Sequence, residues 1–253
     1  MSTLSGATSA WVRRFHPDDQ AATRLVCFPH AGGSATYYFP VSRALSGRAG
    51  VLAIQYPGRQ DRRAERCVDD VRELADLVVG ELRPFADRPM ALFGHSLGAT
   101  LAFEVALRLE AEGIVPLVLF ASGRRAPSKH RDERVHLGTD EQLLRTLERM
   151  SGTDAQVLRD EEMVRSLLPA IRGDYRAAET YRYVPGPPLA CPIVVLTGDR
   201  DPEVTRDEAT AWEGHTTGPF ALHEYPGGHF FLNDHAPTVI ELIGDHLEQV
   251  RLG

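Results

Sequence analysis

The sequence has few cysteines and no excess of positive charge, and each shortage excludes a class of function. Its 253 residues include only three cysteines, Cys27, Cys67 and Cys191, which lie far apart. This spacing fits neither a disulfide framework nor a zinc site, so we expect reduced thiols that lie mostly in the core. Lysine and arginine total 28 against 35 acidic residues, a net charge of -7. A nucleic-acid partner, which requires a concentrated basic surface, is therefore not expected.

Long apolar runs are also missing. The longest stretches, such as residues 115–121, are far too short to cross a bilayer and are typical of buried strands. Residues 1–10 have neither the basic start nor the apolar run of a secretory signal peptide. We therefore expect no membrane association and a cytoplasmic location.

Short apolar runs alternate with longer segments of helical period along the chain. This alternation predicts a single α/β domain over residues 1–253, with a mostly parallel sheet flanked by helices. The expected strands are residues 24–28, 51–55, 90–93, 117–121, 193–197 and 220–225. The expected crossover helices are residues 69–85, 97–112 and 236–250.

One segment, at about residues 127–188, interrupts this alternation. It contains amphipathic pieces at residues 140–150 and 161–181 but no convincing strand. It ends in the proline-rich stretch 183–188, which suits a stiff connection back to the sheet. We interpret this segment as a helical lid inserted into the domain.

The strongest local signal is Gly-His-Ser-Leu-Gly at residues 94–98, between an expected strand and an expected helix. This context is typical of the nucleophile elbow of the α/β-hydrolase fold, in which a sharp turn exposes the serine above the sheet edge. Ser96 is therefore the candidate nucleophile. The alternative is a serine that only caps a helix in a glycine turn.

A serine hydroxyl needs a general base, and ten histidines are available. In this fold the acid and then the histidine follow the serine along the chain. His229 comes directly after two glycines that follow the last expected strand, so it is the favoured base. His95, His235 and His246 are expected to have structural roles.

Two carboxylates, Asp199 and Asp201, follow the expected strand 193–197. A side chain further past the strand end reaches the imidazole more easily, which favours Asp201 as the residue that orients His229. Asp199 is then a turn former that accepts hydrogen bonds from nearby amides.

The negative charge that develops on the substrate oxygen needs two preorganised donors. The amide of Leu97, directly after the nucleophile, is one candidate, and that of Ala31, in the glycine-rich loop 28–33, is the other. A phosphate-binding loop is the rival interpretation of loop 28–33. It lacks the lysine and hydroxyl of a P-loop and the spacing of a dinucleotide fingerprint.

With these motifs in place, the sequence resembles the type II thioesterases, the stand-alone editing enzymes of modular polyketide and nonribosomal peptide synthesis. The similarity spans nearly the whole chain. The matching segments are residues 14–17, 27–33, 56–59, 93–99, 122–127, 187–193 and 228–232.

The resemblance implies hydrolysis of aberrant or stalled acyl groups from the phosphopantetheine arm of acyl or peptidyl carrier proteins. It also implies a triad of Ser96, Asp201 and His229, oxyanion donors at Ala31 and Leu97, and no bound metal or cofactor. A general carboxylesterase or lipase would use the same triad. A catalytically silent binding protein is the third alternative, and an intact triad argues against it.

Basic residues follow the second and fourth expected strands, at the presumed active edge of the sheet. They are Arg59, Arg62, Arg63 and Arg66, and then Arg124, Arg125, Lys129 and Arg131. One hypothesis is that this rim guides an acidic carrier protein, and the alternative is a set of solvated charges balanced by neighbouring acids. Phe230 and Phe231, similarly, either face the acyl chamber or pack in the core.

Overall fold

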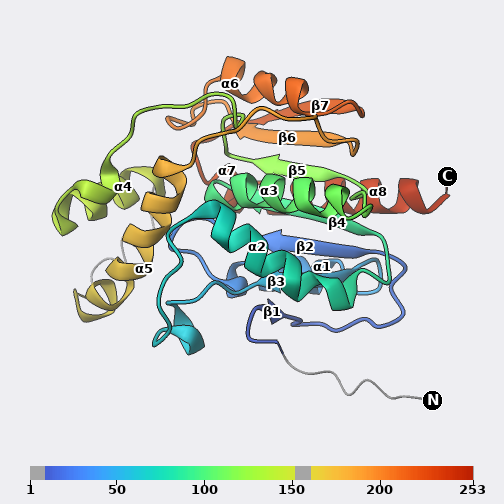
Figure 1. Ribbon diagram of the computed structural model, residues 1–253, viewed down its shortest axis with the longest axis horizontal. Coiled ribbons are helices and arrows are strands. Elements are labelled where there is room, and N and C mark those ends of the chain that lie inside the picture. Colours follow the sequence, from blue (N-terminus) through green and yellow to red (C-terminus); the bar gives the residue numbers. More distant parts are fainter. Residues whose placement is uncertain (1–8, 152–160, 253) are drawn as a thin grey trace.

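The computed structural model describes residues 9–151 and 161–252. These residues fold around one central sheet. Seven strands in these residues have the order β1-β3-β2-β4-β5-β6-β7 (Figure 1). Neighbouring strands pair in parallel except at one edge, where β1 is antiparallel to β3. The strands are β1 (Val12–Arg13), β2 (Arg24–Phe28), β3 (Gly50–Ile54), β4 (Met90–His95), β5 (Leu119–Ser122), β6 (Ile193–Gly198) and β7 (Phe220–Tyr225).

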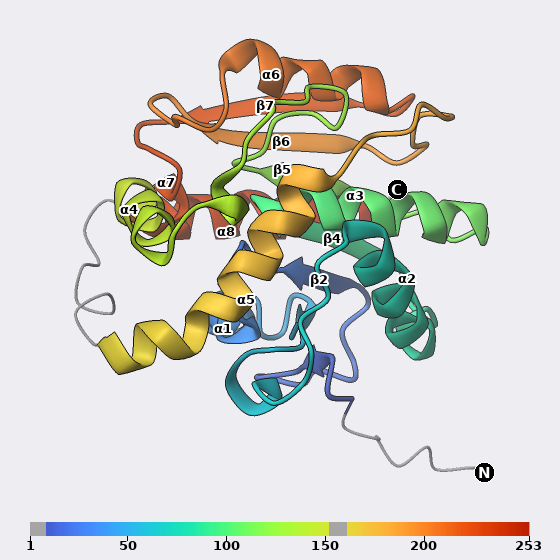
Figure 2. The same cartoon turned by 60° about the vertical axis from the view of Figure 1, so that its left-hand side comes forward.

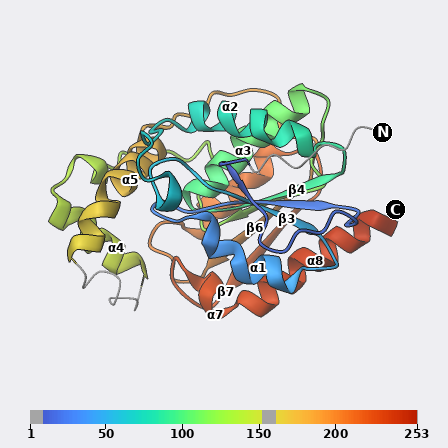
Figure 3. The ribbon, with the colours of Figure 1, turned by 90° about the horizontal axis from the view of Figure 1, so that it is seen from below.

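Helices cover both faces of the sheet, because successive strand residues point to opposite sides. In β2, Val26 and Phe28 belong to one apolar cluster, and Leu25 and Cys27 belong to the other. Figure 3 shows α2 and α3 over one face and α1 and α8 over the other. The helices of the αβ layers are α1 (Phe39–Ala44), α2 (Val71–Leu82), α3 (Leu97–Ala111), α6 (Arg206–Thr210), α7 (Phe231–Asp234) and α8 (Ala236–Leu252). Short 3₁₀-helices are η1 (Ala35–Tyr38), η2 (Gln60–Arg62), η3 (Arg83–Phe85) and η6 (Ala211–His215).

Between β5 and β6, the described residues of segment 127–188 form a helical insertion, the name used for them below. Residues 152–160 of the predicted lid lie outside the described residues. The insertion contains η4 (Val135–Leu137), α4 (Asp140–Ser151) and α5 (Glu161–Thr180), and its described residues form no strand. In Figures 1 and 2, α4 and α5 lie beyond the carboxyl ends of the strands, and α5 crosses in front of that edge. Leu143 of α4 packs with Leu168 and Ile171 of α5, and Ala31 of the first loop packs against this cluster. The insertion therefore lies over the edge at which the loops carry the candidate residues.

The predicted α/β class is confirmed, and each predicted strand and crossover helix is present with its ends within three residues of those expected. The sequence prediction missed β1, which has only two residues, and the short helices α1, α6 and α7. Segments this short do not display a period, so hydrophobic patterning cannot reveal them.

The three thiols are free, and Cys27 and Cys191 lie buried in the core, whereas Cys67 is half-buried. In the described parts of the chain, no helix is both long and apolar enough to span a membrane.

Two glycines allow the backbones of β2, β4 and α3 to meet. A Cβ atom at Gly98 would lie 2.0 Å from the carbonyl oxygen of Phe28, and one at Gly94 would lie 2.1 Å from that of Gly98. The obstructing atoms belong to the backbone and cannot rotate away. Both positions therefore require glycine for close packing of strand and helix.

We predict that Gly98→Ala and Gly80→Ala change stability in opposite directions. Gly98→Ala must displace a central strand and lowers the free energy of unfolding by several kcal/mol, as severe overpacking does. Gly80 is exposed in α2, and its Cβ would meet nothing within 4 Å. Gly80→Ala therefore raises the free energy by about 1 kcal/mol. Urea unfolding measures both, and an equal effect of the two variants would contradict this assignment.

Candidate active site

Ser96 occupies the turn between β4 and α3. Its backbone has φ 55° and ψ -119°, and it is the N-terminal capping residue of α3. A positive φ is strained for a residue with a side chain and costs about 1–3 kcal/mol, and such strain is concentrated at functional sites. The Ser96 amide donates to the carbonyl oxygen of Ser122 at 2.8 Å, which attaches the turn to β5. The geometry is that of the predicted elbow.

Asp201 and His229 form a buried pair on the loops after β6 and β7. The Nδ1 atom of His229 lies 2.9 Å from Oδ2 and 3.1 Å from Oδ1 of Asp201. The side chain of His229 is 1% exposed and that of Asp201 is 0% exposed. The amide of Glu203 donates to Oδ1 of Asp201 at 2.8 Å, so the carboxylate is fixed from its own loop. This arrangement orients the imidazole and leaves Nε2 as its free nitrogen.

Among the described residues, no hydrogen bond joins Ser96 to His229. His95, the neighbour of Ser96, has its ring centroid 5.0 Å from that of His229. The Nε2 atom of His229 is buried and has no hydrogen-bond partner among the described residues. Catalytic hydrogen bonds are often long in the absence of substrate and shorten in the complex. The free Nε2 of His229 is therefore the atom that would accept a proton from Ser96.

Asp199, the rival acid, faces a different group. Its Oδ1 accepts a hydrogen bond from the Gly227 amide at 2.8 Å, and its own amide donates to Tyr225 at 2.8 Å. These bonds join the loop after β6 to the loop that carries His229. Asp199 thus acts as a turn residue, and only Asp201 contacts the imidazole.

The first loop and the elbow face one cavity. Ala31, Ser96 and Leu97 all line it, and its volume is about 110 Å³. Among the hydrogen bonds of the described residues, the amides of Ala31 and Leu97 donate none. Two free amides beside a serine are what an oxyanion site requires.

The helical insertion supplies most of the remaining wall of this cavity. Its other lining residues are Arg124, Glu133, Val135, Thr146, Arg149, Met150, Tyr175, Ala178, Glu179 and Glu203. Sequence reasoning did not predict that these residues line the cavity. For those in α4 and α5, amphipathic periodicity predicted the helices but not which face turns toward Ser96. Neither Phe230 nor Phe231 lines the cavity. Phe231 is 1% exposed in the core, and Phe230 packs on the His95 and His229 rings.

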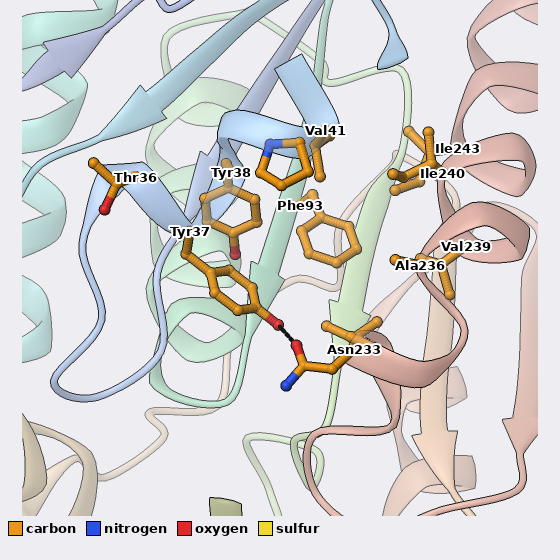
Figure 4. A pocket seen from close by; sticks show the side chains of 12 residues that line it. Thr36, Tyr37, Tyr38, Val41, Phe93, Asn233, Ala236, Val239, Ile240 and Ile243 are labelled. Atoms are coloured by element: carbon orange, nitrogen blue, oxygen red, sulfur yellow. Dashed lines mark hydrogen bonds between the residues drawn. The ribbon is translucent and has the colours of Figure 1, made fainter. Parts of the chain in front are cut away.

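A second, apolar cavity of about 330 Å³ lies between η1 and α8 (Figure 4). Figure 4 shows Tyr37 and Asn233 at its rim, joined by a hydrogen bond of 3.0 Å, with Ile240 and Ile243 across from Phe93. None of the five candidate residues lines it. Its separation from Ser96 excludes it from the candidate active site.

The basic rim predicted from the sequence is wrong for three of its eight residues. Arg59, Arg62 and Arg125 are only 3%, 5% and 5% exposed. They form ion pairs with Asp174, Glu65 and Glu133, respectively. Long side chains that follow a strand can fold back over the protein and satisfy buried acceptors, which sequence position alone does not reveal. Three of the eight proposed docking residues therefore cannot meet a carrier protein.

Buried histidines surround the candidate base. His95 is fully buried, and its Nδ1 lies 3.0 Å from the Ser122 hydroxyl. Burial, and then the nearby His229 and His30 rings, lower the pKa of His95 well below 6.5. Burial likewise lowers the pKa of His30 to about 3. Both rings therefore stay neutral beside His229. In the described residues, no group of three or more His, Cys, Asp or Glu side chains is arranged to hold a metal ion.

We predict that His95 makes the folded protein sensitive to mild acid. The unfolded chain binds a proton at this histidine below about pH 6.5, whereas the folded chain does not. The contribution of this group to the free energy of unfolding is complete above that pH. Below it, the contribution falls by about 1.4 kcal/mol for each pH unit. Urea unfolding between pH 7 and pH 5 should show a shallower loss for His95→Gln. An NMR titration of His95 near pH 6.5 in the folded protein would contradict the assignment.

Known proteins match the chain over most of its length. The thioesterase domain family matches residues 23–247. The chain is 53% identical over 239 residues to the probable cadicidin biosynthesis thioesterase of Streptomyces griseus, covering 94% of this chain and 66% of that protein. It is 51% identical over 246 residues to thioesterase PikA5 of Streptomyces venezuelae, covering 96% of this chain and 88% of that protein.

A solved structure agrees with these sequence matches. The type II thioesterase BorB from the borrelidin biosynthetic cluster has a TM-score of 0.91 and 54% identity, covering 96% of this chain and 99% of that chain. The elbow, the fold and these identities confirm the resemblance predicted from the sequence, and the chain belongs to the thioesterase family.

Proposed function

We propose that the chain is a type II editing thioesterase that hydrolyses acyl groups from the phosphopantetheine arm of carrier proteins in modular synthesis. Ser96 is the nucleophile, His229 the base and Asp201 the residue that orients it. The observation that carries this proposal is the buried pair of His229 and Asp201, at 2.9 Å, beside a serine in a strained elbow. The names of the relatives, which refer to polyketide and antibiotic biosynthesis, support the substrate class.

The mechanism proceeds through an acyl-enzyme. Nε2 of His229 takes the proton of Ser96 as the Oγ attacks the thioester carbonyl, and the resulting oxyanion is held by the amides of Ala31 and Leu97. The C–S bond breaks, and His229 returns the proton to the departing thiolate. Water then attacks the acyl-serine with the same base, which releases the acid and restores Ser96.

Asp201 keeps the proton of His229 on Nδ1 and stabilises the imidazolium that forms in each half-reaction. The neutral rings of His30 and His95 help here, because a second positive charge beside His229 would oppose its protonation. The nucleophile, base and donors all come from the chain. We therefore propose a reaction that needs no bound metal or cofactor, since phosphopantetheine belongs to the carrier.

Cavity size bears on which acyl groups are removed. The cavity at Ser96 has a volume of about 110 Å³ and is lined mostly by the helical insertion. Short acyl groups such as acetyl and propionyl are of that size. We propose that these are the stalled units that the enzyme removes. We also propose that it acts in the cytoplasm, where modular synthesis takes place.

We predict that the protein releases acetyl and propionyl groups from a carrier protein at least about 10-fold faster than decanoyl groups, since the longer chain exceeds the cavity. Ser96→Ala should lower kcat by about 10³-fold or more. Acyl release is measured by mass spectrometry of the carrier. Rapid cleavage of the matching free esters beside slow carrier turnover would indicate a general esterase, and inactivity on both would indicate a binding protein.

We predict that Asp201→Asn lowers kcat by about 10³–10⁴-fold, because the amide does not hold the required tautomer of His229. Asp199→Asn is the matched control. The side-chain oxygen of the introduced asparagine can still accept a hydrogen bond from the Gly227 amide, so kcat should change by less than about 3-fold. The reverse ranking in carrier-bound acyl hydrolysis would assign the acid role to Asp199.

A further inference from the structure

Asp174 of α5 reaches out of the helical insertion and contacts the first loop of the domain. Its Oδ2 accepts a hydrogen bond from the Gly32 amide at 2.7 Å. Asp174 is 1% exposed, although α5 is otherwise an amphipathic helix at the surface. The acceptor is separated from this amide by 142 positions in the chain. The contact therefore joins the insertion to the loop that contains Ala31.

Arg59 completes the contact from the opposite side. Its guanidinium donates to both carboxylate oxygens of Asp174, at 2.7 and 2.8 Å, and to the Gly33 carbonyl at 3.0 Å. Burial disfavours the charge of Arg59, but the Asp174 carboxylate outweighs this effect and raises the guanidinium pKa overall. The charged fork thus fixes the carboxylate in one orientation, with one oxygen toward Gly32.

The first loop depends on these partners for its shape. Gly32 has φ 74°, and the amide of Gly33 donates to the His30 carbonyl at 2.9 Å, which closes a tight turn around Ala31. The hydroxyl of Tyr56 donates to the Pro29 carbonyl at 3.0 Å, and the Arg59 guanidinium lies over the Tyr56 ring. The loop is thus attached before and after Ala31. Its two charged anchors, Asp174 at the Gly32 amide and Arg59 at the Gly33 carbonyl, are paired with each other.

Other ion pairs of α5 differ from this one. Arg176, two residues further along, pairs with Asp69 at 2.6 Å, but the side chains are 59% and 28% exposed. Arg172 pairs with Asp140 of α4, again at the surface. Neither pair contacts loop 29–33. They provide matched controls for the loss of an α5 ion pair as such.

We propose that Asp174 is a positioning residue for the oxyanion site, holding the Ala31 amide in place and making it depend on the position of α5. The inference rests on the proposed function, in which Ala31 is an oxyanion donor. Mispositioning this donor weakens interactions with the transition state more than binding of the ground state. The effect of losing Asp174 therefore falls on kcat and leaves KM nearly unchanged.

The test compares Asp174→Asn with Arg176→Ala in acyl-carrier hydrolysis. Asp174→Asn should lower kcat by about 10- to 100-fold with KM changed by less than about 3-fold, a fraction of the loss for deleting an oxyanion donor. A short-chain trifluoromethyl ketone, whose adduct with serine places an oxyanion in the same site, should lose affinity by the same factor. Arg176→Ala should change each quantity by less than about 2-fold.

Because removing one member of a buried ion pair can prevent folding, a double variant provides a second route. Arg59→Met with Asp174→Leu removes both charges and keeps apolar volume. It should fold, lose kcat as Asp174→Asn does, and show faster hydrogen exchange at residues 31–33. Unchanged kcat in a folded variant would overturn the inference, as would a loss of kcat without the matching loss of ketone affinity.

Failure of the proposed function gives a different pattern. In that case the wild-type protein itself would not release acyl groups from the carrier, or its activity would survive Ser96→Ala. Failure of the positioning role alone leaves the wild-type protein active and dependent on Ser96, with the Asp174 variants equally fast.

Discussion

The close approach of β2, β4 and α3 is the constraint on which the rest of the site depends. With a Cβ atom excluded at Gly94 and Gly98, the strand and helix backbones are in contact, and the chain between them has one residue in which to turn. Ser96 takes a positive φ at that point because packing on both sides determines its backbone. The strain is local, and the buried strands and α3 around it supply the stability that offsets it. The backbone geometry of Ser96, the proposed nucleophile, is in this sense a result of core packing.

Charge is distributed around this rigid centre in a consistent way. Asp201 and His229 are buried as a pair, and the neighbouring His30 and His95 are kept neutral by burial. The buried Arg59, Arg62 and Arg125, in contrast, each have an acidic partner. Removing one partner from such a pair is costly, so these pairs favour one arrangement of the loops. Electrostatics thus fixes the loops, and apolar packing fixes the sheet.

The sequence predicted the structural features that depend on local residue patterns. Strands and crossover helices have a period, and the turn at Ser96 has glycines at fixed positions, so both could be recognised in advance. The proximity of Asp201 to His229 was inferred from the order of loops along the sheet edge. The burial of Arg59 and Arg125 could not be predicted, because their partners lie far away in sequence or require the folded loop. The same holds for Tyr175 and Glu179, which reach the cavity only through the tertiary placement of α5.

In the proposed reaction, Ser96 receives the acyl group from a carrier-bound thioester. Rapid mixing of the enzyme with an acetylated carrier protein, acid quenching within the first turnover and peptide mass spectrometry test it directly. We expect an acetyl group on the peptide that contains Ser96, formed together with free carrier thiol and lost during later turnover. Acetyl transfer to another residue, or release of acetate with no enzyme-bound acetyl group at any time, would contradict it.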